Sequence, residues 1–222
     1  MKAAPSYSRD AIPSIAARLE RQSASDIIGW AVGEFGSELV VACSFQDCVL
    51  LDLAVSVDAR IEVLFLDTGY HFQETLDFVE TVRRHYSLNL TTVHPGSRAA
   101  AFPCGSDQCC QWRKVEPLER ALLDRSAWVT GLKRSDAPTR ATTPVVGWDE
   151  SRGMVKVNPL ALWSDGQIAE YVQSHSLPEH PLTRQGYLSI GCAPTTRPVK
   201  DGEDPRAGRW ADSDKTECGL HG

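Results

Sequence analysis

Short apolar runs alternate with helical patterns through the first two thirds of the chain. The segment 38–43 (ELVVAC) is apolar and β-branched, ends in the polar loop 44–48 (SFQDC), and continues into a helical pattern at 49–55 (VLLDLAV). The same order recurs, with further apolar runs at 60–66, 88–94 and 127–132. Strands that are joined by helical crossovers are parallel, and the helices then cover both faces of the sheet. We therefore expect an α/β fold with a mostly parallel sheet and helices on both faces.

Elements at both ends of this repeat complete the expected domain. Two helical patterns, at 13–21 and 25–35, precede the first strand. After the last parallel strand, the segment 145–157 has the pattern of a β-hairpin that turns at an Arg-Gly pair. A final helix is expected to begin at Ser164, because Ser164 and Gln167 have the spacing of a capping box.

The last part of the chain has a different texture. From Pro178 onward the sequence is rich in proline, glycine and charge and shows no periodic pattern. We expect residues 1–177 to form the α/β domain with its N-terminal helices and residues 178–222 to form an extended C-terminal tail. Loops of this length are usually functional or disordered.

Composition excludes several classes of protein. Hydrophobic residues make up 42% of the chain and charged residues 23%, as in ordinary globular proteins. The longest apolar run, 49–57, is interrupted by Asp52 and is far shorter than the roughly 20 residues that span a bilayer. The first residues reach Arg9 and Asp10 before any apolar stretch forms. We expect a soluble, cytoplasmic protein without a membrane segment or secretory signal.

The net charge of −6 disfavours broad binding to nucleic acids, because a phosphate backbone needs a basic surface. It leaves room for a small anionic ligand, since a few local arginines can outweigh the overall sign. The sequence therefore indicates a small-molecule site and no nucleic-acid partner.

Seven cysteines, an odd number, indicate metal binding or catalysis more than a disulfide framework in a cytosolic chain. Cys109 and Cys110 are adjacent at the start of a predicted helix that runs to residue 123, where successive side chains point about 100° apart. Both would therefore fit poorly into one core, and we expect a metal or cluster site with Cys192 as the distant partner. Cys104 could stand near this pair, although nothing in the sequence requires it. The remaining two, Cys43 and Cys48, are expected to pack among apolar side chains.

Polar loops follow three of the predicted strands and should line one crevice at the carboxyl ends of the sheet. Ser44 and nearby backbone N–H groups precede a helix, which is a natural seat for an anion. Asp67, Thr68 and Gly69 follow the next strand, where a glycine lets the backbone approach a planar base closely.

The third loop is basic. Lys133, Arg134 and Arg140 lie in the stretch TGLKRSDAPTR, and arginine forks suit phosphate or sulfate groups. Taken alone, this loop fits a solvated surface equally well. Its placement beside the other two loops is what favours an anion site.

Cys218 is the cysteine best suited to be a nucleophile. It lies in the terminal KTECGLHG, between Lys215 and His221, where a role in a core is implausible. Thiols beside cationic groups are ionised more readily and react faster. Arg206 and Arg209, in DPRAGRW, could accompany it and neutralise an anion.

Six segments in the same order resemble the assimilatory adenylyl-sulfate (APS) and phosphoadenylyl-sulfate (PAPS) reductases. They are SFQDCVL, LDTGYHF.ET, CC..RK..PL, TGL.R.DAPTR, Y.SIGC and the terminal KTECGLH, and they cover nearly the whole chain. The resemblance implies an adenine-nucleotide α-hydrolase-like fold. It also implies that Cys218 attacks the activated sulfate, that an S-sulfocysteine forms, and that thioredoxin then releases sulfite.

Residue roles follow from the resemblance, position by position. Lys114, Arg140, Arg206 and Arg209 would contact the substrate, and the loops at Ser44 and at Asp67 to Gly69 would surround the nucleotide. We add Arg134 and His221 to the expected substrate contacts, because both are cationic groups inside the matching segments.

The chain departs from the family pattern at one position. The cluster-containing members hold a [4Fe–4S] cluster with a CC pair and a C-x-x-C pair, and Cys109, Cys110 and Cys192 match three of these ligands. The fourth position is Thr195, whose hydroxyl is a poor ligand for iron. Three outcomes remain open: a cluster bound by three thiolates with one iron open, an unstable cluster, or a lost cluster.

Other functions remain to be weighed. The stretch PTTR is similar to the cluster-free members that use PAPS, whereas the three cysteines favour APS. ATP pyrophosphatases share this fold but bind ATP through S-G-G-x-D-S, and SFQDC lacks both glycines. An iron–sulfur redox sensor is a non-enzymatic alternative, although a sensor has no need of the terminal ECGLH. We expect a thioredoxin-dependent APS reductase.

Overall fold

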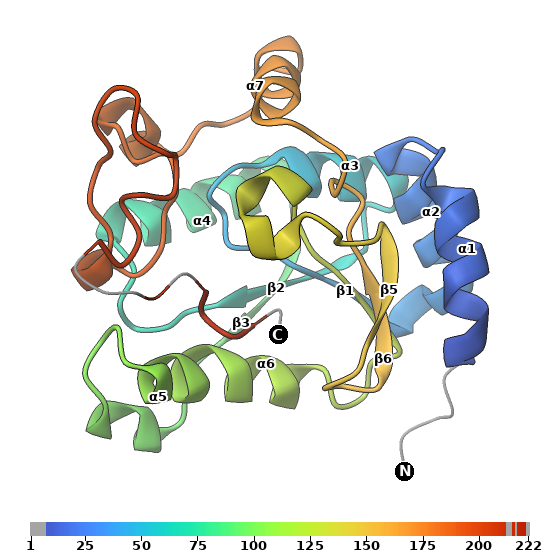
Figure 1. The fold of residues 1–222 in the computed structure, drawn as a ribbon, viewed down its shortest axis with the longest axis horizontal. Coiled ribbons are helices and arrows are strands. Elements are labelled where there is room, and N and C mark those ends of the chain that lie inside the picture. Colours follow the sequence, from blue (N-terminus) through green and yellow to red (C-terminus); the bar gives the residue numbers. More distant parts are fainter. Residues whose placement is uncertain (1–7, 212–214, 216, 221–222) are drawn as a thin grey trace.

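The computed structural model of the chain describes residues 8–211, 215 and 217–220. It contains a single six-stranded sheet with helices on both sides (Figure 1). The strands are β1 (Leu39–Ala42), β2 (Glu62–Leu66), β3 (Asn89–Val93), β4 (Ala127–Val129), β5 (Val146–Asp149) and β6 (Met154–Val157). The helices are α1 (Ile12–Leu19), α2 (Ala24–Phe35), α3 (Val49–Val57), α4 (Gln73–Tyr86), α5 (Asp107–Cys110), α6 (Glu116–Ala121) and α7 (Asp165–Ser174).

The order of the strands determines where the ligand-binding crevice lies. The order is β3-β2-β1-β4-β6-β5, and every neighbouring pair is parallel except the hairpin of β5 and β6. The chain steps outward from β1 to β2 and β3, then returns to place β4 on the other side of β1. The carboxyl ends of β1 and β4 therefore flank the point where the direction of winding reverses, which is where open α/β sheets bind ligands. The predicted parallel sheet and hairpin are confirmed.

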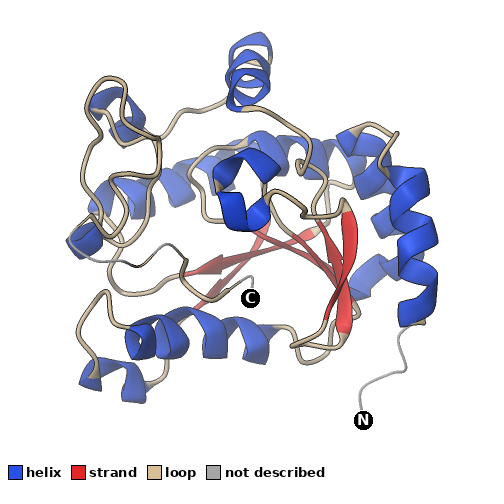
Figure 2. Cartoon of the chain, in the orientation of Figure 1, coloured by secondary structure: helices blue, strands red, loops and turns tan. Residues whose placement is uncertain are grey.

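Both faces of the sheet are buried, as the continuous apolar runs predict. Along β1, Leu39 and Val41 face the larger hydrophobic core, which also contains residues from α1, α2, α3 and α4. Val40 points to the opposite face and packs with Leu118 and Leu122 at the C-terminal end of α6. Figure 2 shows the strands as one layer between these two groups of helices.

Side-chain caps explain where two of the helices begin. Ser23 caps α2, and its hydroxyl accepts a hydrogen bond from the N–H of Asp26 while the Asp26 carboxylate returns to Ser23. Ser164 and Gln167 form the same reciprocal pair at the start of α7, so the predicted capping box is confirmed. None of the helices in the described ranges is long and apolar enough to cross a membrane.

The tail folds back over the carboxyl edge of the sheet. Its described part contains short 3₁₀ turns at Pro181–Gln185 and Ala193–Thr195 and one isolated bridge between Thr196 and Arg209. The Gln46 amide holds it in place by donating to the Leu188 carbonyl at 3.3 Å and accepting from the Ile190 N–H at 3.1 Å. In Figure 1 the described part of the tail, coloured orange to red, follows this path toward α6, where Leu220 packs.

Candidate active site

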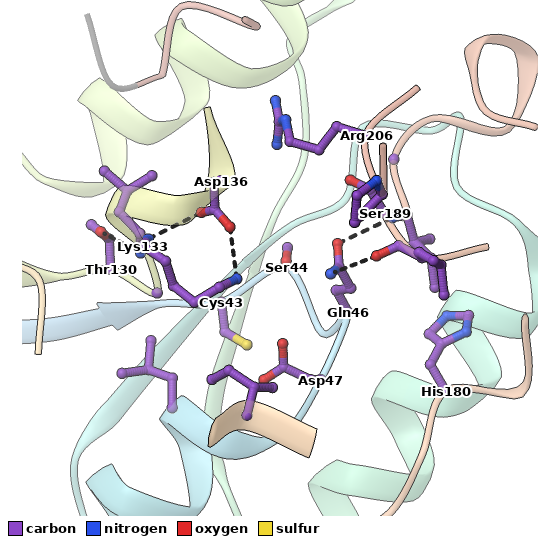
Figure 3. A pocket seen from close by; sticks show the side chains of 18 of the residues that line it. Cys43, Ser44, Gln46, Asp47, Thr130, Lys133, Asp136, His180, Ser189 and Arg206 are labelled. Carbon is purple, nitrogen blue, oxygen red and sulfur yellow. Dashed lines mark hydrogen bonds and ion pairs between the residues drawn. The ribbon is translucent and has the colours of Figure 1, made fainter. Parts of the chain in front are cut away.

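A cavity of about 1000 Å³ opens at the carboxyl ends of β1 and β4. The loops after both strands form its floor, and tail residues from Ser189 to Cys192 and at Arg206 form its far wall (Figure 3). Cys218 also lines it. The structure thus brings the loops that follow the strands and the terminal cysteine, Cys218, to one site.

Phe45 and Asp47 determine the shape of the loop after β1. Phe45 has a positive φ of 57° yet is fully buried, with its ring 5.4 Å from that of Phe65, so Ser44 and Gln46 are turned outward. The Asp47 carboxylate accepts a hydrogen bond from the N–H of Val49 at 3.0 Å, at the start of α3. Burial raises the pKa of this carboxyl. Ser44 lines the cavity as predicted, but Asp47 already occupies part of the expected anion seat.

After β2, one of the three predicted residues faces the cavity. Thr68 is buried, lines the cavity, and lies 3.6 Å from the Cys192 sulfur through its hydroxyl. Asp67 instead accepts a hydrogen bond from the Gly69 N–H at 2.9 Å and closes a local turn. Gly69 has a φ of +71°, and a Cβ there would lie 3.3 Å from the Arg113 guanidinium. Its glycine serves that turn and that contact, and Gly69 does not line the cavity.

The basic loop after β4 is divided between the cavity and the surface. Lys133 lines the cavity and pairs with Asp136 at 2.6 Å. Arg134 points away, since its Nε donates to the Thr143 carbonyl at 2.8 Å and its Nη2 pairs with Glu20 at 2.6 Å. The structure therefore does not bring Arg134 to the cavity with the other predicted substrate contacts, because both ends of its fork have partners elsewhere.

Two arginines meet at the Glu217 carboxylate in the cavity. Arg140 donates two hydrogen bonds to it, from Nε at 2.8 Å and from Nη2 at 2.7 Å. Arg206, from the tail, lies 3.7 Å from the same carboxylate. Asp136 also accepts from Arg140 at 3.1 Å. Although burial works against the charge of Arg140, Glu217 and Asp136 raise its pKa.

Arg209 lies in the cavity wall. Its Nη1 donates to the Ser189 hydroxyl and to the Ile190 carbonyl, each at 3.3 Å, and its guanidinium stacks on Trp210 at 4.6 Å. Gly191 makes room for it, since a Cβ at this position would overlap the guanidinium. Burial, and secondarily the charge of Arg206, lower the pKa of Arg209.

Lys114 is a buried cation that lines the cavity. It lies in a π-helical turn, Gln111–Val115, that interrupts the predicted helix between α5 and α6. Such turns are frequent at functional sites. Burial alone would lower the pKa of Lys114, but the sulfur atoms of Cys192 and Cys218 outweigh it and raise that pKa. Lys114 and Cys218 thus interact electrostatically in the same cavity.

The neighbours of Cys218 along the sequence behave differently from expectation. Lys215 pairs with Asp107 at 2.9 Å and donates to the Cys110 sulfur at 3.3 Å. The Lys215 ammonium therefore interacts with α5. Lys114 is the lysine that interacts with Cys218, the role that was expected of Lys215. His221 lies outside the described residues.

The remaining cysteines separate into two groups. Cys48 is buried in the larger core and Cys43 packs against that core, which confirms their predicted apolar packing. Cys109 and Cys110 are both buried as well, but neither belongs to a hydrophobic core, in line with the expectation that both would fit poorly into one core. They lie outside both hydrophobic clusters, because their short helix is at the edge of the sheet under the tail.

Cys104 contacts Cys192 across the chain. A hydrogen bond from the Cys104 thiol lowers the pKa of Cys192 to about 4, helped by Lys114 and Thr68 against the effect of burial. The same contact, with burial, raises the pKa of Cys104. Within the described ranges, no three His, Cys, Asp or Glu side chains converge on a position for a single metal ion.

His180 is a cavity residue that sequence reasoning missed. It is buried, its Nε2 lies 3.0 Å from the Thr75 hydroxyl, and its Nδ1 accepts from the Leu182 N–H at 3.2 Å. Burial lowers its pKa to about 4. The sequence showed only a histidine in a tail without a periodic pattern. No residue near it in the sequence indicated that it would pack against α4.

Comparison with known proteins agrees with this geometry. A family model described as "Phosphoadenosine phosphosulfate reductase domain" matches residues 38–198. Over 213 residues the chain is 46% identical to a protein of Streptomyces coelicolor named adenosine 5'-phosphosulfate reductase, covering 92% of this chain and 90% of that one.

Solved structures show the same relationship. The chain is similar to the PAPS reductase of Candida auris in its phosphate complex, with a TM-score of 0.76 and 28% identity, covering 88% of this chain and 100% of that one. Candida glabrata FMN adenylyltransferase, at 19% identity, has a TM-score of 0.63 over 90% of this chain and 71% of that one. The likeness to that adenylyltransferase confirms the adenine-nucleotide α-hydrolase-like fold. The chain belongs to the phosphoadenosine phosphosulfate reductase family.

Proposed function

We propose that the protein is a thioredoxin-dependent adenosine 5'-phosphosulfate reductase that converts APS to sulfite and AMP in assimilatory sulfate reduction. The observation that carries this proposal is the presence of Cys218 in one cavity with Lys114, Arg140, Arg206 and Arg209. A nucleophilic thiol and several cations in one crevice suit a compact anionic substrate with a good leaving group. The names of the similar bacterial proteins support the same assignment.

Glu217 marks the place where an anion binds. Its carboxylate accepts a forked pair of hydrogen bonds from Arg140 and lies near Arg206, the arrangement that a phosphate or sulfate group also prefers. When APS binds, its charged oxygens take over these contacts. The nucleotide then lies toward Ser44 and Thr68 at the ends of β1 and β2.

The chemistry divides one hard displacement into two exchanges at sulfur. The Cys218 thiolate attacks the sulfur of APS, the sulfur–oxygen bond to the phosphate breaks, and the electron pair leaves on AMP. A thioredoxin thiolate then attacks the Cys218 sulfur and expels sulfite with the electron pair of the sulfur–sulfur bond. The second thioredoxin cysteine resolves the mixed disulfide, so two thioredoxin thiols are oxidised for each sulfite formed.

Lys114 places a buried positive charge in the cavity that Cys218 lines. It is buried, and its ammonium interacts with both the Cys218 and Cys192 sulfur atoms. In a site of low polarity a fixed positive charge stabilises a thiolate and, later, the developing charge on the leaving phosphate. Arg140, Arg206 and Arg209 hold the anion while Cys218 approaches.

We further propose that the protein holds a [4Fe–4S] cluster with Cys109, Cys110 and Cys192. The donor set fits, because these thiols are buried, are drawn from two segments, and have Lys114 and Lys215 nearby. A single ion needs ligands that converge on one point, whereas in a cubane each thiolate binds its own iron. When bound, the cluster would tie the C-terminal end of α5 to the tail and add a charged group beside Lys114.

A PAPS reductase without a cluster is the second candidate. Thr195 stands at the fourth ligand position, and the Candida auris protein is named for PAPS. The three cysteines and the bacterial relatives favour APS. Thioredoxin as reductant and a cytoplasmic location, where thioredoxin is reduced, belong to the proposal in either case.

Sulfite release with APS and with PAPS tests the proposal. We expect APS to be the better substrate, and Cys218→Ser to lower turnover by at least about 1000-fold, the scale for removing a covalent nucleophile. Without thioredoxin, wild-type protein should accumulate a sulfonate adduct on Cys218, visible by mass spectrometry. Cys48→Ala, inside the core, is the matched control and should retain activity. Substantial turnover by the serine variant, or a preference for PAPS, would contradict the assignment.

A further inference from the structure

Cys104 lies next to the cysteine site although it belongs to neither cysteine motif. Its thiol is close enough to the Cys192 and Cys109 sulfur atoms for electrostatic interactions. It also contacts the Thr195 side chain through a hydrogen bond. Cys104 therefore reaches the side chain that stands where a fourth cysteine ligand is expected.

The loop that carries Cys104 is built to stay there. Gly105 has a φ of +96°, and a Cβ at this position would lie 3.1 Å from the Thr195 methyl group, so the loop packs directly on that side chain. Ser106 caps α5 by accepting a hydrogen bond from the Cys109 N–H at 3.1 Å. Lys215 spans the same turn, with its ammonium 3.4 Å from the Gly105 and Ser106 carbonyl oxygens.

From this geometry we propose that Cys104 supplies the fourth thiolate of the iron–sulfur cluster, in place of Thr195. The proposal rests on the cluster assigned under the proposed function, and it changes the ligand set from three cysteines to Cys104, Cys109, Cys110 and Cys192. The site is then held by a 104–110 segment with three thiolates and a tail segment with one.

Ligand chemistry supports Cys104, in place of Thr195, as the fourth ligand. Iron in these clusters binds thiolate far better than a neutral hydroxyl, so Thr195 would leave one iron open to solvent. Cys104 is only partly exposed and already touches the two side chains that border the open position.

Two other roles for Cys104 predict different behaviour. As a packing residue it would be indifferent to iron and replaceable by alanine. As a disulfide partner of Cys192 it would form a covalent bond that excludes both thiols from the cluster. Iron content and thiol reactivity separate these roles from cluster ligation.

The test compares Cys104→Ala with Cys48→Ala, which removes a thiol inside the core. Both variants and the wild type are purified anaerobically and assayed for iron, acid-labile sulfide and visible absorbance. We expect about four irons per chain in the wild type and in Cys48→Ala. Cys104→Ala should hold about three or fewer, show the EPR signal of a three-iron cluster after mild oxidation, and lose iron several-fold faster to a chelator.

A second variant guards against simple misfolding. In the Cys104→Ala background, Thr195→Cys supplies a thiolate at residue 195, beside residue 104. This thiolate should act as the fourth ligand and restore iron to the wild-type content. In the wild-type background, Thr195→Cys should add no iron, because the fourth position is already occupied. Alkylation gives an independent readout, since Cys104 should be protected in the loaded protein and modified after chelation.

The outcomes separate this inference from the proposed function. Equal iron content in wild type and Cys104→Ala, with more iron in Thr195→Cys, would overturn the role of Cys104 and leave the cluster in place. An iron-free wild type, or one with a Cys104–Cys192 disulfide on peptide mapping, would overturn both the cluster and the ligand. Reduction of APS by that same iron-free protein would show that the reductase assignment survives.

Discussion

At the scale of the residue, the arginines of the cavity differ in what holds them. Arg140 and Arg206 meet at the Glu217 carboxylate, whereas Arg209 is fixed by Ser189 and by the space above Gly191. Their shared feature is that all three line the same cavity. Arg134, by contrast, is paired outside the cavity, and adjacency in sequence to Lys133 gave no sign of that.

Replacing any one of Arg140, Arg206 or Arg209 with alanine should weaken APS reduction. A charged hydrogen bond contributes about 1.5–3 kcal/mol, which corresponds to a loss of roughly 10- to 150-fold in kcat/KM. Steady-state sulfite release at several APS concentrations measures this effect. Arg184→Ala is the control, since this arginine is 78% exposed and pairs with Glu179. Unchanged kinetics in all three cavity variants would refute their role.

At the scale of the element, the end of the tail is held by two different contacts. Glu217 binds Arg140, and Leu220 packs against the hydrophobic cluster of α6. The tail therefore rests in the cavity with its own carboxylate where an anionic ligand would bind. Substrate and Glu217 then compete for the same arginines.

Glu217→Gln should strengthen nucleotide binding. The amide keeps the shape of Glu217 but removes the charge that competes for Arg140 and Arg206, so AMP should bind about 5-fold more tightly, corresponding to about 1 kcal/mol for the loss of one competing ion pair. Turnover should fall, because the tail loses an anchor. Calorimetric titration with AMP measures the first effect, with Glu179→Gln as the charge-matched control. An AMP affinity that is unchanged or weaker in Glu217→Gln would show that the two do not compete.

At the scale of the whole molecule, His180 joins the tail to the α/β domain. Its ring lies between the Thr75 hydroxyl and the Leu182 N–H and stands 5.1 Å from Phe78. Burial lowers its pKa from 6.5 to about 4, outweighing Glu74, which acts in the opposite direction. The folded protein therefore resists protonation of a group that the unfolded chain protonates readily.

Stability should consequently fall as the pH drops from 6.5 to 4. In this range the unfolded chain binds a proton at His180 that the folded protein does not, so the free energy of unfolding decreases by at most about 3 kcal/mol. His180→Asn keeps an acceptor for Leu182 and removes the titration. Urea unfolding at pH 7, 6 and 5 should give a shallower pH dependence for this variant. Parallel pH profiles for the two proteins would contradict the assignment.

Local patterns in the sequence were sufficient for most of the fold. Apolar runs followed by polar loops located the strands, and the Ser164 and Gln167 pair located the start of α7, because both depend on neighbours within a few residues. The helix that was expected to run from Cys110 to residue 123 is instead interrupted by a π-helical turn. Its π-helical turn depends on burying Lys114 under the tail, which is a contact between distant segments.

The sequence by itself determined the α/β architecture, the family and the residues that can do chemistry, because motif order and hydrophobic period are local properties. Only the tertiary structure decided which of those residues meet. It turned Arg134 outward to Glu20, used Gly69 for a turn beside Arg113, and placed Lys114 with Cys218 in the position expected of Lys215. It also brought Cys104 to Cys192, a contact 88 residues apart in sequence that follows from how the tail closes over the sheet.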